Sequence, residues 1–234
     1  MDTMPMPGGA IMSPWMPMCG QSWIGAAASF LGMWTAMMAA MMLPSLVPTL
    51  WRYQRAVGGA GALPAPLATL LVAGGYLFVW TLLGAAVYVL GAATMSVTMR
   101  YGALGRTVPV ATGLLVLAAG VLQLTRWRAR HLACCRHGCH PPGMGWRSSA
   151  TDACGAWIRG LRLGLHCSQC CAGLTAVLLV TGIMDLPIML AVTAAITLER
   201  LAPGGERIGR ITGIAVIAAG LFLTVRAAGR ACAT

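Results

Sequence analysis

The chain has 234 residues, of which 58% are hydrophobic and only 9% charged, and its mean hydropathy is +0.77. Soluble globular domains carry about 25% charged residues, so this composition excludes that class and indicates a protein embedded in the lipid bilayer. The net charge of +11 comes from arginines that flank apolar runs, which favours contact with lipid head groups over nucleic-acid binding. Five acidic residues without an acid-base pair or a nucleotide-binding motif predict no enzyme.

The amino-terminal stretch 1–22 is rich in Met, Pro and Gly and lacks the cationic start of a signal peptide, so we expect an exposed, largely unstructured tail. A membrane-spanning helix needs roughly 20 apolar residues. Runs of that length occur at about 23–45, 67–92, 107–125 and 208–228.

The stretch 166–200 is too long for one span and is broken only at Met184-Asp185-Leu186-Pro187, which predicts a hairpin of two helices with Asp185 capping the turn. The predicted fold is therefore all-α. It is a polytopic transmembrane bundle of about six helices over residues 23–230, with a Cys/His loop at about 126–162 and no soluble domain.

All 16 cationic residues are arginines, and they are distributed unevenly between the predicted loops. With the amino terminus outside, twelve of them fall on inside segments and four on outside segments. This is the arrangement that the positive-inside rule prefers, so we expect an external amino terminus.

The first predicted helix carries sulfur on one face. Its residues at helical spacing are Trp34, Met37, Met38, Met41 and Ser45, before Pro44 and Pro48 disturb the last turns. Thioethers bind Cu(I) without losing a proton, so Met37, Met38 and Met41 are candidate ligands. Flexible apolar packing is the alternative. The methionines of the tail add a possible capture site for copper: Met4, Met6, Met12, Met16 and Met18.

The main candidate metal site is the segment His166-Cys167-Ser168-Gln169-Cys170-Cys171, at the predicted start of a helix. Cys167, Cys170 and Cys171 are spaced i, i+3, i+4 and so project from one helical face. Thiolates suit Cu(I), Zn(II) or Hg(II), and the positive end of the helix dipole would favour thiolate over thiol. The alternative is that these cysteines are small hydrophobic residues of a membrane helix.

A second group of soft ligands lies in the predicted cytoplasmic loop, with Cys134 and Cys135 as its main candidates. The loop would complete the first site, form a separate docking site, or be a plain basic surface. Its spacing fits no zinc-finger pattern. The full group is His131, Cys134, Cys135, His137, Cys139 and His140. Further along, Glu199 and Arg200 are expected to form an interfacial ion pair.

Several segments resemble a bacterial family of predicted metal-binding integral membrane proteins, a domain of unknown function sometimes labelled copper chaperone. The resemblance rests on Trp34 to Pro44 (WTAMMAAMMLP), Gly75-Tyr76 with Trp80, Gly120 to Arg126 (GVLQLTR), Cys167 to Cys171, Gly182 to Leu186 (GIMDL) and Glu199-Arg200-Leu201. Where such proteins tend to have Gly-Cys-Cys-Trp, this chain has Gln169-Cys170-Cys171-Ala172. The resemblance implies the bacterial inner membrane.

Together these patterns predict a membrane protein that binds Cu(I) through Cys and Met ligands and passes it across the membrane or to a metal-donor or metal-acceptor protein. Cys167, Cys170 and Cys171 are the expected primary ligands, with His166 beside them and Met37 and Met41 as thioether partners if the two helices touch. A heavy-metal transporter for Hg(II) and a scaffolding subunit of a redox complex are the alternatives.

Overall fold

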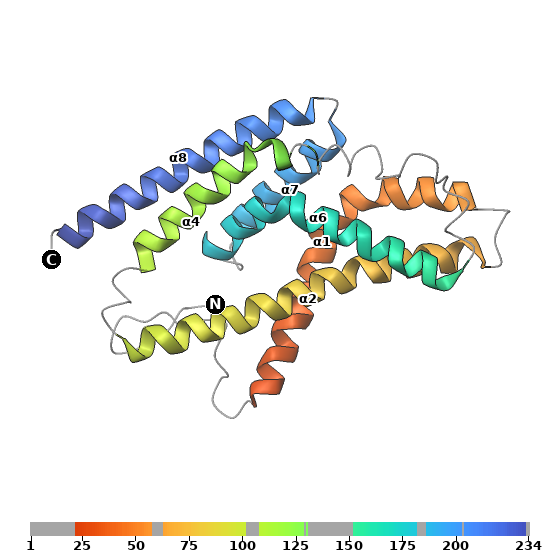
Figure 1. Ribbon diagram of the computed structural model, residues 1–234, viewed down its shortest axis with the longest axis horizontal. Helices are drawn as coiled ribbons and strands as arrows, with labels where there is room; N and C mark the ends of the chain where they lie inside the picture. Colours follow the sequence, from red (N-terminus) through yellow and green to blue (C-terminus); the bar gives the residue numbers. More distant parts are fainter. Residues whose placement is uncertain are drawn as a thin grey trace.

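The computed structural model describes residues 22–57, 63–101, 108–128, 130, 152–181, 186–202 and 204–232. Figure 1 shows an all-α arrangement, as predicted. Its helices are α1 (Trp23–Val57), α2 (Ala65–Arg100), α4 (Val108–Gln123), α6 (Ala153–Thr181), α7 (Leu186–Leu201) and α8 (Gly205–Cys232). The methionines of the tail, Asp185, and the Cys134 and Cys135 group fall outside the described residues.

Helix length divides the bundle into two classes. By length and composition, α1, α2, α6 and α8 are apolar enough over a sufficient length to cross a membrane. By contrast, α4 and α7 have 16 residues each, which corresponds to about 24 Å at 1.5 Å per residue. The hydrocarbon core of a bilayer is about 30 Å thick. Both helices are therefore shorter than the roughly 20 residues that a membrane-spanning helix needs.

The start of α6 differs from the prediction. This helix begins at Ala153, so the last part of the predicted loop is helical and the cysteines lie near the middle of a 29-residue helix. Asp152 precedes it, a residue type favoured at the N-cap, and its carbonyl accepts a hydrogen bond from the Ala156 amide at 3.1 Å. Arg159 and Arg162 had suggested a loop. The expected stabilisation of the thiolates by a helix amino terminus is therefore wrong.

The two prolines of α1 lie inside the helix, at Pro44 and Pro48. Each removes a backbone N–H and crowds the preceding turn, which is the usual cause of a kink. Figure 1 shows α1 as two limbs that run in different directions. The bend brings Ser45 to the inside of the bundle, where its side chain is buried.

Helices α2 and α6 touch through glycines. A Cβ at Gly160 would clash with the Val72 carbonyl oxygen, and a Cβ at Gly164 would lie 2.9 Å from the Val79 Cβ. Small residues let membrane helices approach closely. Residue numbers rise together along the two helices, from the contact of Val72 with Gly160 to the contact of Val79 with Gly164. Helices α2 and α6 therefore run parallel.

Helices α4 and α8 form a second close pair, drawn side by side in Figure 1. A Cβ at Gly120 would lie 2.7 Å from the Ile217 side chain, and one at Gly220 would lie 2.6 Å from the Leu117 amide nitrogen. Here the residue numbers rise on one helix as they fall on the other, so the pair is antiparallel. Both directions agree with helices that cross a bilayer alternately.

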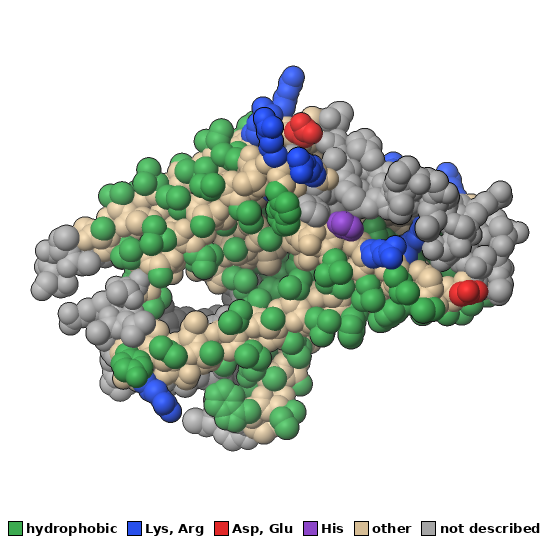
Figure 2. Space-filling model, in the orientation of Figure 1, with side chains coloured by type: hydrophobic (Ala, Val, Ile, Leu, Met, Phe, Trp, Pro, Cys, Tyr) green, Lys and Arg blue, Asp and Glu red, His purple; other side chains and the backbone are tan. Residues whose placement is uncertain are grey.

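The outer faces of the helices are apolar. Figure 2 shows hydrophobic side chains along α2, α4 and α8, while charged side chains gather where α7 meets α8. The exposed apolar residues of α8 include Ile211, Ile214, Leu221, Phe222 and Val225. A soluble protein rarely exposes so continuous an apolar surface. This distribution, together with the four long apolar helices, is compatible with a protein that lies in a membrane.

Candidate metal centre

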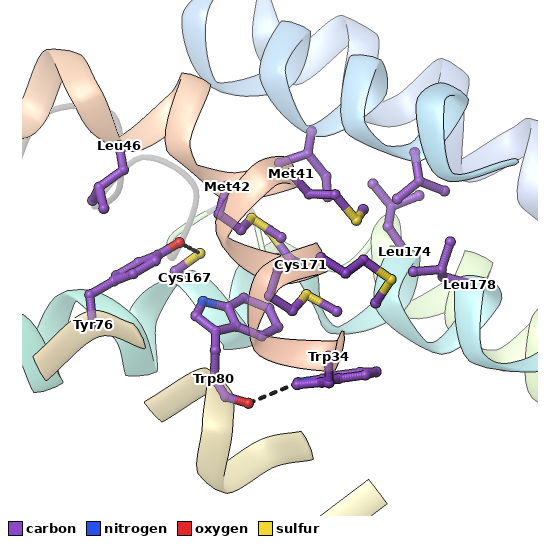
Figure 3. Packing of buried hydrophobic residues seen from close by; sticks show 14 of the residues in the cluster. Trp34, Met41, Met42, Leu46, Tyr76, Trp80, Cys167, Cys171, Leu174 and Leu178 are labelled. Carbon is purple, nitrogen blue, oxygen red and sulfur yellow. Dashed lines mark hydrogen bonds between the residues drawn. The ribbon is translucent and has the colours of Figure 1, made fainter. Parts of the chain in front are cut away.

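The methionine face predicted for α1 is buried. Met37, Met38, Met41 and Met42 are between 1% and 8% exposed, and all of them belong to the main hydrophobic core. Trp34, one turn before them, is fully buried and donates its indole N–H to the Trp80 carbonyl at 2.9 Å, which fixes α1 against α2. The thioethers therefore face the interior of the bundle, as Figure 3 shows for Met41 and Met42.

The three thiols of α6 lie in the same core. Cys167 and Cys170 are 1% exposed and Cys171 is 2% exposed, while the thiol of Cys154 at the start of α6 is exposed. The sulfurs of Cys170 and Cys171 are 3.7 Å apart. One buried cluster contains both the α1 methionines and the three thiols of α6 (Figure 3).

A guanidinium lies among the three sulfurs. The Nη2 atom of Arg200, from the last turn of α7, donates to the Sγ atoms of Cys167 at 2.8 Å, Cys170 at 3.1 Å and Cys171 at 3.5 Å. Its Nη1 atom donates to Ser45 Oγ at 3.1 Å, and that hydroxyl donates to the Met42 carbonyl at 2.9 Å. Arg200 thereby joins α7 to the thiols of α6 and to the bend of α1.

A tyrosine hydroxyl completes the surroundings of Cys167. The Oη atom of Tyr76 lies 2.9 Å from the Cys167 sulfur, and Tyr76 is 1% exposed (Figure 3). The close approach of α2 and α6 at Gly164 brings the two together, because a side chain there would strike the Tyr76 carbonyl at 3.1 Å. A hydroxyl can donate to a thiolate or accept from a thiol, so it suits either form of the ligand.

Glu199, the residue before Arg200, has a different partner. Its carboxylate forms a buried ion pair with Arg128, not with Arg200, so the predicted interfacial pair between neighbours is wrong. Gln123 donates to the same carboxylate at 3.2 Å, and the Arg128 Nε donates to the Cys170 carbonyl at 2.9 Å. This network fixes the end of α7 against α4 and against the helix that carries the thiols.

The three thiols have the chemistry that a soft metal ion requires, but their sulfur atoms are not yet placed to coordinate one. A trigonal ion with metal–sulfur bonds of about 2.3 Å holds its sulfurs about 4.0 Å apart, close to the separation of Cys170 and Cys171. Within the described ranges, however, no group of three or more Cys, His, Asp or Glu side chains is arranged to hold an ion as it stands. The sulfurs lie 2.8 to 3.5 Å from a guanidinium nitrogen, so a bound ion needs them to move inward.

The predicted ligands are thus brought together in part. Cys167, Cys170 and Cys171 converge, and Met37, Met38 and Met41 share their core. His166 is half-buried on α6 and is offset around the helix from its neighbour Cys167, because adjacent residues do not face each other. Whether the cysteines of the loop reach this site depends on residues outside the described part of the chain.

Sequence reasoning missed Arg200 and Tyr76 as neighbours of the thiols. Tyr76 entered the sequence analysis only through the family resemblance, and Arg200 only through an ion pair with Glu199. The available signal was an arginine next to an apolar run, since ionisable side chains within membrane segments usually face the bundle interior and find partners there.

The helices and the thiol core define an all-helical protein whose four long apolar helices are compatible with a membrane, with a sulfur-rich centre between α1, α6 and α7. The chain belongs to the family PpoB2, described as copper chaperone, whose sequence model matches residues 31–223. That match confirms the resemblance drawn from the sequence motifs, and it covers every helix discussed here at least in part. No curated protein and no solved structure matches the chain.

Proposed function

We propose that this protein binds Cu(I) at the thiols of Cys167, Cys170 and Cys171 and passes it to another protein or across the bacterial inner membrane. The observation that carries the proposal is the convergence of three buried sulfurs on one cationic nitrogen. Soft thiolates favour Cu(I) over hard cations such as Mg²⁺, and the name of the family points to the same metal. Copper is here the cargo of the protein.

The methionines of α1 supply a second set of soft ligands beside the thiols. Thioethers bind Cu(I) weakly and without proton release, whereas thiolates bind it strongly. Under the proposal an ion moves from Met37, Met38 and Met41 to the cysteines by ligand exchange. The predicted topology places the start of α1 outside, so the direction of transfer is inward.

Nothing in this role requires covalent chemistry. The buried thiols are held among apolar side chains, where they are protected from bulk oxidants, and no acid-base pair adjoins them in the described part of the chain. We therefore propose a carrier and not an enzyme, with the lipid bilayer and a metal-donor or metal-acceptor protein as its partners.

The test is a titration of reduced, anaerobic protein in detergent with Cu(I), against a calibrated competing chelator. We expect one tightly bound ion per chain, lost in the variant that carries Cys167→Ser, Cys170→Ser and Cys171→Ser. Cys154→Ser is the matched control, because its thiol is exposed on the same helix, and it should bind like the parent protein. The same titration with Hg(II) and the same variants tests the mercury alternative.

Three outcomes separate the proposals. Tight Cu(I) binding that depends on the three cysteines supports a copper carrier. Tight Hg(II) binding without competitive Cu(I) binding favours a heavy-metal transporter. If neither ion binds above the level of the triple variant, the thiols are structural and a scaffolding role remains.

A further inference from the structure

The most unusual feature of the thiol centre is that a cation already occupies it. Arg200 Nη2 lies within 3.5 Å of all three sulfurs, which is the region that a shared metal ion must enter. A guanidinium nitrogen and a metal ion compete for the same sulfur lone pairs. The two cannot both be bound at bonding distance to the three sulfurs.

We infer that Arg200 is a displaceable occupant of the metal site: it holds the three sulfurs together in the metal-free protein and withdraws when Cu(I) enters. The inference rests on the proposed function and adds a specific residue and movement to it. It also accounts for the absence of a ready-made metal geometry among the described residues. The sulfur atoms lie at hydrogen-bonding distances from a nitrogen donor. Under this inference they move inward to bonding distance from the ion after the exchange.

The position of Arg200 allows this movement. The residue is half-buried, one position before α7 ends at Leu201, and its long side chain reaches the thiols from the end of the helix. Glu199, in contrast, is 2% exposed and paired with Arg128. The backbone of α7 is therefore fixed by one residue, while the guanidinium of the next can leave by rotation of its side chain once its hydrogen bond to Ser45 is broken.

Charge favours a monovalent ion in this exchange. For a given number of thiolates, replacing a guanidinium by Cu(I) or Ag(I) leaves the charge among the sulfurs unchanged, whereas Zn(II) or Hg(II) adds one unit that the loss of a further thiol proton must offset. A buried site of low dielectric penalises an uncompensated charge. The occupant thus selects for soft monovalent ions as well as holding the ligands in place.

The first test measures the withdrawal directly. Detergent-purified protein is treated with the arginine reagent phenylglyoxal, with and without one equivalent of Ag(I), and modification of Arg200 is quantified by mass spectrometry. We expect faster modification of Arg200 in the silver-loaded protein. Arg207, exposed on the first turns of α8, is the internal control and should react at one rate in both samples. Equal or slower modification of Arg200 after loading overturns the inference.

The second test uses Cu(I) affinity. The charge-assisted hydrogen bonds from Arg200 must break before the ion enters, so removing the competitor with Arg200→Gln should raise the affinity about ten-fold or more. Arg200→Lys keeps a cation that can still compete, so its affinity should lie below that of Arg200→Gln, and Arg207→Gln is the matched control. A weaker site in Arg200→Gln that Arg200→Lys restores would mean that the arginine neutralises the bound ion, which overturns displacement.

The two tests separate this inference from the proposed function. Suppose that the parent protein binds Cu(I), but that the phenylglyoxal reactivity of Arg200 does not change and Arg200→Gln does not raise the affinity. The displacement of Arg200 is then wrong, and the proposed copper-carrier function is unaffected. If the parent protein does not bind Cu(I), the proposed function itself fails. Thermal unfolding of Arg200→Gln and Arg200→Lys identifies a variant that fails only because it does not fold.

Discussion

Gly75 of α2 and Gly160 of α6 lie against each other with no side chain between them. A Cβ at Gly75 would be 2.6 Å from the Trp157 carbonyl oxygen and 3.2 Å from the Gly160 Cα. This contact sets the separation of the two parallel helices. It also determines whether Tyr76, the next residue of α2, reaches Cys167.

Gly160→Ala should therefore destabilise the protein. The added methyl group meets backbone atoms of α2 that cannot move independently, and overpacking of this kind costs about 1–3 kcal/mol. Thermal unfolding in detergent measures the effect. Gly32→Ala is the matched control, since a Cβ at Gly32 of α1 meets nothing within 4 Å, and it should leave the unfolding temperature nearly unchanged. Equal behaviour of the two variants would refute the close contact.

Tyr76→Phe should weaken copper binding without removing it. The hydroxyl that contacts the Cys167 sulfur supports the ligand, and loss of such a neighbour lowers metal affinity about ten-fold or more. The chelator competition described above measures the change. Tyr88→Phe is the control, because the Tyr88 hydroxyl is buried and has no hydrogen-bond partner among the residues that the structure describes. A Tyr76→Phe protein with unchanged affinity would show that the hydroxyl has no part in the site.

The ion pair of Arg128 and Glu199 should be important for folding. Glu199→Gln leaves the buried guanidinium of Arg128 without its counter-charge, and breaking a buried pair on one side costs about 3–5 kcal/mol. The yield of folded protein and its unfolding temperature should both fall. Glu206→Gln removes an exposed acid of α8 and should have little effect.

A double variant refines that prediction. Replacing both charges, with Arg128→Met and Glu199→Met, avoids an unpaired buried charge and should recover part of the stability lost in Glu199→Gln. Recovery would be incomplete, because Arg128 also donates to the Cys170 carbonyl. A double variant that is less stable than Glu199→Gln would contradict the role assigned to charge pairing.

Met38→Leu and Met41→Leu together should slow copper loading while leaving the thiol site intact. A Met-to-Leu exchange keeps the apolar volume, at a cost below about 1.5 kcal/mol for each site, but removes the thioether. The number of bound ions should stay constant. We expect the rate of Cu(I) uptake from a chelator to fall roughly ten-fold. This factor corresponds to about 1.4 kcal/mol of lost thioether binding. Met95→Leu on α2 is the control. An unchanged uptake rate in the α1 variant would mean that Met38 and Met41 take no part in copper loading.

The fold class and the convergence of the cysteine sulfurs could be predicted from the sequence because both depend on local patterns. Long apolar runs predict helices, and the i, i+3, i+4 spacing of Cys167, Cys170 and Cys171 requires only a helix to bring the sulfurs together. The burial of Met37, Met38 and Met41 followed from helical periodicity in the same way. These predictions required no knowledge of which helices pack together.

The predictions that were wrong, and the neighbours of the thiols that were missed, depend on contacts between segments far apart in the sequence. Arg200 lies 33 residues from Cys167 along the chain, and Glu199 lies 71 from Arg128. No local pattern distinguishes these partners from an ion pair between neighbours. The start of α6 was missed for a related reason. Its arginines suggested a loop, whereas packing of Gly160 and Gly164 against α2 favours a helix over the same residues.

The shortness of α7 has a consequence for how the protein sits in a bilayer. A helix of 16 residues spans about 24 Å, which is less than the hydrocarbon thickness of about 30 Å. Such hydrophobic mismatch is relieved by local thinning of the bilayer or by recession of the helix end below the lipid surface. In a bilayer, either response would bring water and head groups closer to the end of α7. Under the proposed function, the rate of ion exchange at the buried sulfurs should then depend on the acyl-chain length of the surrounding lipids.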